Sequence, residues 1–315
     1  MPEISLALGG GGIKGIAHIG VLNVLERTGI KVRAVAGTSA GGIIGAAFSS
    51  GLGSDRIKEI ILKMDQKSLF QRGKNEGPAI LGLAGLTNLL TEVLGDRLIS
   101  DLQIPFACTA VDLDAGQEII LTQGRVVDAI LATIAVPGVF PPKLWNGHTL
   151  VDGGVLDPVP IALARWLAPE LPVVAVFLSP PPENWRELAP IELPINAPIP
   201  QPILERISRL RISQAIRIFG ESYDISTRML GELRVQMDHP DVLIRPDVKE
   251  FGIVDQVNPE TLIQRGISAA ERAVPDIMKS CSWKNRIPRY FLQVSPPGKI
   301  LEPHDEDETK QDQAS

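Results

Sequence analysis

A serine lies at the centre of the segment Gly37-Thr38-Ser39-Ala40-Gly41, which has the pattern G-x-S-x-G. Glycines two residues before and two residues after a serine allow a sharp strand-to-helix turn, which holds the hydroxyl out at a sheet edge and at a helix N-terminus. A serine in that position can act as a nucleophile. The same pattern also occurs in ordinary Gly/Ser-rich turns, so its chemistry depends on what surrounds it.

A run of glycines from Gly9 to Gly12 precedes Lys14 and Gly15 and follows an apolar segment of strand length. Consecutive backbone N–H groups without side chains can point into one space at a helix N-terminus and bind an anion there. The run could therefore form a tight turn, hold a phosphate, or stabilise an oxyanion. Nucleotide-binding motifs are disfavoured, because residues 36–39 end the second strand without an acidic residue and Gly15 stands where a Walker loop needs Ser or Thr.

A base must activate Ser39, and Asp152 is the candidate with the best position. It follows an apolar segment and precedes Gly153 and Gly154, which let the backbone bend away so that the carboxylate projects into a site. Asp-Gly also occurs in ordinary turns. The four histidines, none of which lies in a motif, are His18, His148, His239 and His304.

These residues need a scaffold of strands and helices. Residues 4–8 and 32–36 are strand-like, and residues 16–25 between them have helical periodicity, so the chain begins β-α-β-α. That order predicts a parallel sheet covered by helices. Further strands are predicted at residues 105–113, 117–122, 144–145, 148–151 and 172–178.

Two turn signals fix the ends of elements. Asn146-Gly147 predicts a hairpin turn, and the second strand of that hairpin ends at Asp152. Asn258-Pro259-Glu260 has the N-cap, the N1 proline and the early acidic residue that open a helix. The hairpin matters most, because it delivers the candidate base.

Taken together, three segments resemble the patatin-like phospholipases, specifically their bacterial branch. Residues 10–22 are similar to the opening block of the family, residues 37–41 to its nucleophile elbow, and residues 152–154 to its aspartate motif, in the same order and at similar spacing. Residues 136–142 are similar to its proline-rich approach to that motif. The resemblance is specific over residues 4–160 and extends without motifs to about residue 279.

The resemblance implies a three-layer α/β sandwich with a mainly parallel central sheet and helices on both faces. It also implies a Ser-Asp dyad in place of a Ser-His-Asp triad. Ser39 would attack an ester carbonyl of a lipid, and Asp152 would accept its proton and later activate the water that releases the acyl group. Gly10, Gly11 and Gly12 would donate N–H bonds to the oxyanion.

The other residues of the motifs would support this site. Lys14 stands at a basic position of the family, where it could hold the glycine loop, attract a phosphate, or be a solvated lysine at a helix start. Asp157 stands where the family more often has Asn, which places a second carboxylate near the site. The glycines expected to support the motifs are Gly15, Gly37, Gly41, Gly153 and Gly154.

The implied function is that of a serine lipid acyl hydrolase, of phospholipase, lysophospholipase or esterase type, without a metal or an organic cofactor. Three alternatives stay open. An ordinary α/β-hydrolase could use Ser39, Asp152 and His239, although that fold places its elbow after several strands. An acyltransferase could use the same serine with a different acceptor, and a regulatory adaptor could have the fold without the activity.

Composition limits the function classes further. The 31 basic and 37 acidic residues give a net charge of −6, so nucleic acid is not an expected partner. Only Cys108 and Cys281 occur, which excludes a disulfide framework and fits a reducing compartment. Residues 1–3 lack the basic start of a secretory signal. We therefore expect a cytoplasmic protein that could contact membranes peripherally, and the sequence leaves its oligomeric state open.

Residues 1–280 are expected to form the hydrolase domain and residues 281–315 a C-terminal extension, disordered from about residue 296 because it turns polar and acidic. Residues 179–202 are rich in proline and are expected to form an irregular loop that could act as a lid. The segments at 80–94 and 203–237 combine apolar positions at helical spacing, and the second also carries arginines. Either could contact lipid, although core packing and a solvated helix face are common alternatives.

Overall fold

A mixed sheet forms the centre of the molecule in the computed structural model, which describes residues 1–66, 68–73, 77, 79–187, 212–252, 255–282, 289 and 294–301. Along the sheet the order is β5-β6-β3-β2-β1-β7-β8, and β4 pairs with β3 and with β9. The strands are β1 (Glu3–Leu8), β2 (Lys31–Gly37), β3 (Phe106–Asp112), β4 (Gln117–Leu121), β5 (Lys143–Trp145), β6 (His148–Asp152), β7 (Val173–Val176), β8 (Val242–Ile244) and β9 (Lys299–Ile300). From β3 to β8 all neighbouring strands are parallel, and the hairpin β5-β6 joins β3 in the antiparallel direction.

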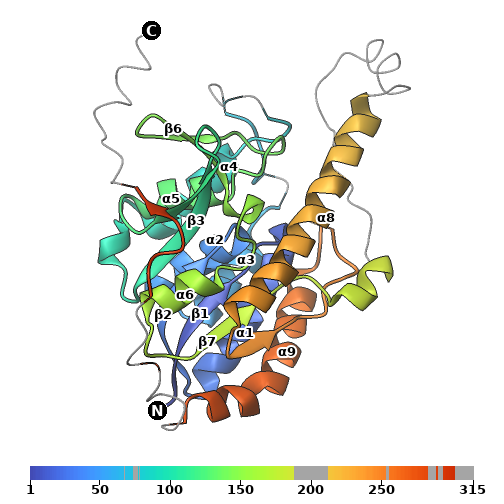
Figure 1. The fold of residues 1–315 in the computed structure, drawn as a ribbon. Helices are drawn as coiled ribbons and strands as arrows, with labels where there is room; N and C mark the ends of the chain where they lie inside the picture. Colours follow the sequence, from blue (N-terminus) through green and yellow to red (C-terminus); the bar gives the residue numbers. More distant parts are fainter. Residues whose placement is uncertain are drawn as a thin grey trace.

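Helices cover both faces of this sheet, as Figure 1 shows. They are α1 (Ala17–Arg27), α2 (Ala40–Ser49), α3 (Ser54–Lys63), α4 (Ala84–Leu94), α5 (Val126–Thr133), α6 (Ile161–Leu167), α8 (Ile212–Asp238) and α9 (Pro259–Ser280). Short 3-10 helices are η1 (Gly12–Ile16), η2 (Ile99–Asp101), η3 (Gly153–Val155) and η4 (Pro182–Glu187). In the described part of the chain, no helix is both long and apolar enough to cross a lipid bilayer.

Alternation along β1 shows how the layers arise. Leu6 and Leu8 belong to a large core with residues of α1, α2, α5 and α9. Ala7, between them, belongs to a second core on the other face, against α6. Successive side chains of a strand point to opposite faces, and a sheet buried on both faces reads as a continuous apolar run. The predicted three-layer α/β architecture is therefore confirmed.

Most predicted elements occur within one or two residues of their expected bounds, and the hairpin across Asn146-Gly147 forms with Trp145 opposite His148. The cap of α9 is also confirmed, because the Asn258 side chain accepts a hydrogen bond from the Glu260 N–H. One difference lies at the first helix, where the 3-10 helix η1 precedes α1. After the glycine run the backbone first forms the tighter turns of a 3-10 helix, and the α-helix begins only at Ala17.

Two expectations about irregular segments need correction. Disorder from about residue 296 is wrong for the first residues of the tail, because Lys299 and Ile300 pair in parallel with β4 and Leu301 is buried. An edge strand can recruit a short apolar segment from a polar tail through backbone hydrogen bonds alone. The 3-10 helix η4 lies within the proline-rich segment 179–202. Residues 188–202 are outside the described residues, so a lid there stays a prediction.

Candidate active site

Ser39 occupies a strained turn between β2 and α2. Its φ is 53° and its ψ is −124°, a conformation that non-glycine residues rarely adopt and that persists only when neighbours enforce it. The Ser39 N–H donates to Oγ1 of Thr133 at 2.9 Å. The Thr38 hydroxyl lies 2.8 Å from that of Thr109 and donates to the backbone carbonyl of Asp157 at 2.9 Å. These bonds fix the predicted nucleophile elbow on both sides of the serine.

The glycines that flank the elbow leave no room for a side chain. A Cβ on Gly41 would lie 2.0 Å from the Leu8 carbonyl oxygen, and one on Gly37 would lie 2.6 Å from Cα of Gly42. A Cβ on Gly15 would lie 2.4 Å from that of Ala40. The three glycines therefore let β1, η1 and α2 approach the serine closely.

Gly41→Ala is expected to lower the free energy of unfolding by at least about 1–3 kcal/mol, because the backbone of β1 must move away from the new methyl group. Urea unfolding followed by circular dichroism would measure this. Gly53→Ala is the matched control, since its Cβ would have only the Glu26 carboxylate nearby, at 3.4 Å. Equal stability of the two variants would contradict the argument.

Asp152 ends β6 beside β3, where it pairs with Ala110. Its side chain is 2% exposed, and Oδ1 accepts a hydrogen bond from the Gly154 N–H at 2.7 Å. Burial raises the pKa of the carboxyl to about 7, while the Ser39 hydroxyl and the Gly154 N–H act to lower it. A carboxyl with this pKa can both accept and return a proton near neutral pH. A Cβ on Gly153 would lie 2.0 Å from Oγ1 of Thr109, so only glycine fits at the position after Asp152.

Ser39 and Asp152 line the same cavity, of about 80 Å³, together with Gly10, Gly11 and Gly12. The Ser39 hydroxyl is close enough to the carboxylate to lower its pKa. Even so, Oδ2 of Asp152 is buried without a hydrogen bond of standard geometry to any described residue. This oxygen is therefore a free acceptor beside the serine hydroxyl.

The glycine loop differs from its predicted role at one position. The Gly10 N–H donates to the Pro158 carbonyl at 3.0 Å, as the Gly9 N–H does to Val176, so Gly10 is committed to closing the loop and cannot donate to an oxyanion. The N–H groups of Gly11 and Gly12 have no acceptor among the described residues. Gly11 has a φ of 155° and Gly12 a φ of 59°, which only glycine adopts readily. Two N–H groups, not three, are free to face the cavity.

His18 holds the glycine loop through a hydrogen bond to its backbone. Its ring is fully buried, and Nε2 lies 2.8 Å from the Gly9 carbonyl, to which it donates when the ring is neutral. Burial lowers the pKa of the imidazole to about 4, so the ring carries no charge near neutral pH. The structure therefore gives His18 a positioning role on the glycine loop.

The other histidines lie away from the serine. Nδ1 of His148 is 2.7 Å from Oδ2 of Asp112, and His239 is exposed beyond the C-terminal end of α8. His304 is outside the described residues. Among described residues, no histidine lines the cavity that holds Ser39 and Asp152. This arrangement disfavours a triad built with His239.

Helix α8 supplies a wall that the sequence motifs did not reveal. Tyr223, Asp224, Thr227 and Arg228 line the cavity opposite the glycine loop, and Nε of Arg228 lies 2.8 Å from Oδ2 of Asp224. Their spacing of one, three and four residues places them on one helical face, which is the only local signal that could have found them. The nearest of them is about 70 residues from Asp152 along the chain.

Lys14 lines the same cavity and is not a solvated lysine. Its side chain is buried, and burial lowers the pKa of the ammonium group while the Asp224 carboxylate acts to raise it. Arg228 adds a second positive charge that lowers the Lys14 pKa. Two basic side chains and one carboxylate, that of Asp224, therefore line the cavity together with Asp152.

Asp157 does not line the cavity that holds Ser39 and Asp152. It is fully buried, 3.9 Å from Nε of Arg234, and burial together with the nearby Glu118 raises the pKa of its carboxyl well above the usual range. Arg234 also binds Glu118, at 2.9 Å, and so ties α8 to β4. The second carboxylate expected near the site thus belongs to a buried cluster behind it.

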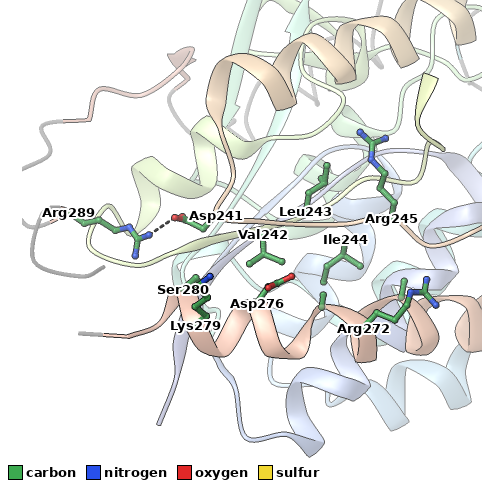
Figure 2. A pocket seen from close by; sticks show the side chains of 12 residues that line it. Asp241, Val242, Leu243, Ile244, Arg245, Arg272, Asp276, Lys279, Ser280 and Arg289 are labelled. Atoms are coloured by element: carbon green, nitrogen blue, oxygen red, sulfur yellow. Dashed lines mark hydrogen bonds and ion pairs between the residues drawn. The ribbon is translucent and has the colours of Figure 1, made fainter. Parts of the chain in front are cut away.

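A larger cavity lies elsewhere, between β8 and α9. Its volume is about 790 Å³, and Figure 2 shows charged side chains such as Arg245, Arg272 and Asp276 around it. Arg289 pairs there with Asp241. None of the residues predicted to do chemistry lines this cavity, so volume does not locate the active site.

Known proteins resemble the chain over half of its length or more. Residues 6–165 match the family model described as patatin-like phospholipase. Uncharacterized NTE family proteins of Mycobacterium bovis and Mycobacterium tuberculosis are 34% identical over 185 residues, which cover 56% of this chain and 49% of each relative. Patatin-like phospholipase domain-containing protein 7 of Rattus norvegicus is 29% identical over 180 residues, covering 55% of this chain and 13% of that protein. The chain spans about half the length of the mycobacterial relatives.

Among solved structures, VipD from Legionella pneumophila has a similar fold. The TM-score is 0.54 at 13% sequence identity, and the match covers 87% of this chain and 66% of VipD. At this identity the likeness concerns the fold alone. It agrees with the α/β sandwich described above.

Proposed function

Because the chain belongs to the patatin-like phospholipase family, we propose that it is a serine lipid acyl hydrolase in which Ser39 and Asp152 form a catalytic dyad. The observation that carries the proposal is the free Oδ2 of Asp152, buried beside the Ser39 hydroxyl in a cavity that the glycine loop also lines. An acceptor without a partner beside a hydroxyl is what proton transfer requires. The substrate is an ester of a lipid, of phospholipid, lysophospholipid or simpler type.

The reaction proceeds in two halves. Ser39 Oγ attacks the ester carbonyl while its proton passes to Oδ2 of Asp152, and the leaving alcohol takes that proton as the acyl-enzyme forms. Water then enters, gives a proton to Asp152, and attacks the acyl carbonyl, after which Ser39 recovers its proton and the fatty acid leaves. Each tetrahedral oxyanion accepts hydrogen bonds from the N–H groups of Gly11 and Gly12.

The residues around the dyad lower the barrier in specific ways. An oxyanion donor contributes roughly 3–4 kcal/mol in other hydrolases, so two aligned N–H groups account for a large part of the rate. The N-terminus of α2 places positive charge at the serine. Lys14 and Arg228 supply basic side chains that can bind a leaving group bearing a phosphate.

Labelling with a fluorophosphonate tests the proposal directly, since this probe bonds only to an activated serine. The expected result is one label per chain, together with release of p-nitrophenol from p-nitrophenyl esters. A folded protein that neither takes the label nor hydrolyses an ester would favour the regulatory adaptor. Acyl transfer to an added alcohol that exceeds hydrolysis would favour the acyltransferase.

Peripheral contact with lipid is part of the proposal and rests on the outer face of α8. From residue 218 to residue 238, none of the exposed side chains of this helix is charged. The large apolar ones are Ile218, Phe219, Ile225, Met229, Leu233 and Met237. Figure 1 shows α8 running along the outside of the fold, and its inner face lines the catalytic cavity. An apolar face on such a helix can lie in the interface of a bilayer. The arginines between residues 206 and 217, which from the sequence alone could form part of a lipid contact, are outside the residues whose side chains are described.

The double variant Ile225→Glu/Met229→Glu is expected to lose at least tenfold in binding to phosphatidylcholine vesicles, measured by flotation, because two carboxylates would enter the interface. Its turnover of a soluble ester should stay within about twofold of wild type. Leu113→Glu, at an exposed turn outside α8, is the control. Unchanged flotation of the double variant would exclude this face as the contact.

A further inference from the structure

A second cavity also opens at Ser39, and unlike the first it has no charged side chain in its wall. Its volume is about 170 Å³, and it lies among α2, α3, α4 and the segments before and after them. Apart from Ser39, every side chain that lines it is apolar. Leu86, Leu89, Leu90 and Val93 of α4 belong to its wall, so part of the apolar stripe seen in the sequence at 80–94 faces a cavity. An apolar cavity that ends at a serine hydroxyl suits an apolar group of a substrate and does not suit water or a charged group.

The cavity follows one face of α2. Ser39, Ile43 and Ala47 all line it, and residues four apart lie on the same helical face. At 1.5 Å rise per residue, Ala47 lies about 12 Å along the axis from Ser39. An extended acyl chain advances about 1.2 Å per bond. The value is taken from an extended polypeptide, in which three bonds span up to about 3.6 Å. The distance along α2 therefore fits about ten carbon atoms.

We propose that this cavity holds the acyl chain of the substrate, with the ester carbonyl at Ser39 and the end of the chain at Ala47. The inference rests on the proposed hydrolase function and names the acyl group that this site selects, an unbranched chain of about ten carbons. The cavity with Lys14 and Arg228 takes the alcohol part, because the two cavities meet at Ser39 and only this one has charged side chains in its wall. The ester is thereby held in one orientation.

Burial explains why chain length should matter. Each methylene removed from water improves binding about fourfold, provided that the cavity has room for it. Beyond Ala47 no residue of α2 lines the cavity, so we expect the gain to stop there. Ala47 is the last residue of α2 in the wall, and a larger side chain there would shorten the cavity along this helix, so we expect this position to set the length.

The test compares kcat/KM for p-nitrophenyl acetate, hexanoate, decanoate and palmitate. Wild type is expected to improve with each added pair of carbons up to about ten and not beyond. Ala47→Phe should lower the ratio of decanoate to acetate at least tenfold, because the ring fills the cavity. Ala47→Leu should lower it less and covers the case in which Ala47→Phe does not fold.

The matched control is Ala115→Phe, the same substitution at an exposed turn between β3 and β4, which should leave the ratio at the wild-type value. A decanoate-to-acetate ratio unchanged in both Ala47 variants would overturn the acyl assignment while leaving the hydrolase intact. Absence of turnover with every ester, acetate included, would instead overturn the proposed function itself. The two failures are therefore distinguishable.

Discussion

Ser39→Ala is expected to lower kcat toward every ester by a factor on the order of 10⁴ to 10⁶. The nucleophile is then missing, and neither the glycine loop nor Asp152 can form an acyl-enzyme. The fold should not change, because the bonds that hold the elbow come from the Ser39 backbone N–H and from Thr38. Alanine meets the same strain at a φ of 53° that serine already bears.

The measurement pairs fluorophosphonate labelling with turnover of p-nitrophenyl esters, and urea unfolding serves as the check on folding. A stable Ser39→Ala protein without label or turnover is the expected outcome. Turnover within tenfold of wild type would assign the nucleophile to another residue. His239→Ala, in a residue away from the cavity, is the control for the alternative triad, and it should leave both readouts unchanged.

Asp152→Asn is expected to lower kcat by about 10² to 10⁴, because an amide cannot accept the serine proton. In wild type, kcat/KM should rise as pH increases through about 7, the pKa to which burial raises the carboxyl, and level off above it. Below that pH the carboxyl is protonated, and the rate falls about tenfold per pH unit. The residual activity of Asp152→Asn should lack this inflection. His18, with a pKa of about 4, cannot supply it.

The same substitution should stabilise the fold at alkaline pH. In the unfolded chain the carboxyl ionises near its ordinary value of 3.8, whereas in the folded chain it holds its proton up to about 7. Between these values the folded state binds more protons, so stability falls as pH rises through the window, by up to about 4 kcal/mol. An uncharged amide avoids that loss.

Urea unfolding at pH 4 and pH 8 measures the difference. Asp152→Asn should match wild type at pH 4 and exceed it at pH 8, because its neighbours, including the buried Asp157, titrate in both proteins. A variant that is less stable than wild type at pH 8, or a rate profile that is flat between pH 5.5 and 8, would contradict a raised pKa at Asp152.

How much of the site the sequence predicts depends on how far apart along the chain the interacting residues lie. The elbow at Ser39 and the hairpin that ends at Asp152 each follow from a few adjacent residues, since glycine placement and Asn-Gly turns specify the backbone locally. The two meet because of the pairing register, in which Asp152 lies opposite Ala110 of β3 and Gly37 of β2 lies opposite Cys108 of the same strand. Proline content likewise predicted an irregular loop at 179–202, although the 3-10 helix η4 within it did not follow from composition.

The glycine loop shows the limit of local reasoning. Three consecutive glycines are equivalent in sequence, and only the Pro158 carbonyl, brought in from the loop after β6, takes the N–H of Gly10 and leaves those of Gly11 and Gly12. The burial of Lys14 depends in the same way on α8, whose residues Tyr223 and Arg228 are about 200 positions distant. No pattern near Lys14 encodes that contact.

The sequence by itself therefore determined the sheet, the turn that carries Ser39, the hairpin that ends at Asp152 and the place of the glycine loop, because turns, caps and alternation act over a few neighbouring residues. Only the tertiary structure decided which N–H groups are free, that Asp152 has a raised pKa, and that a cavity with charged side chains and an apolar cavity meet at Ser39. Those properties arise from burial and from contacts between distant segments, and their free energies depend on the whole packed chain.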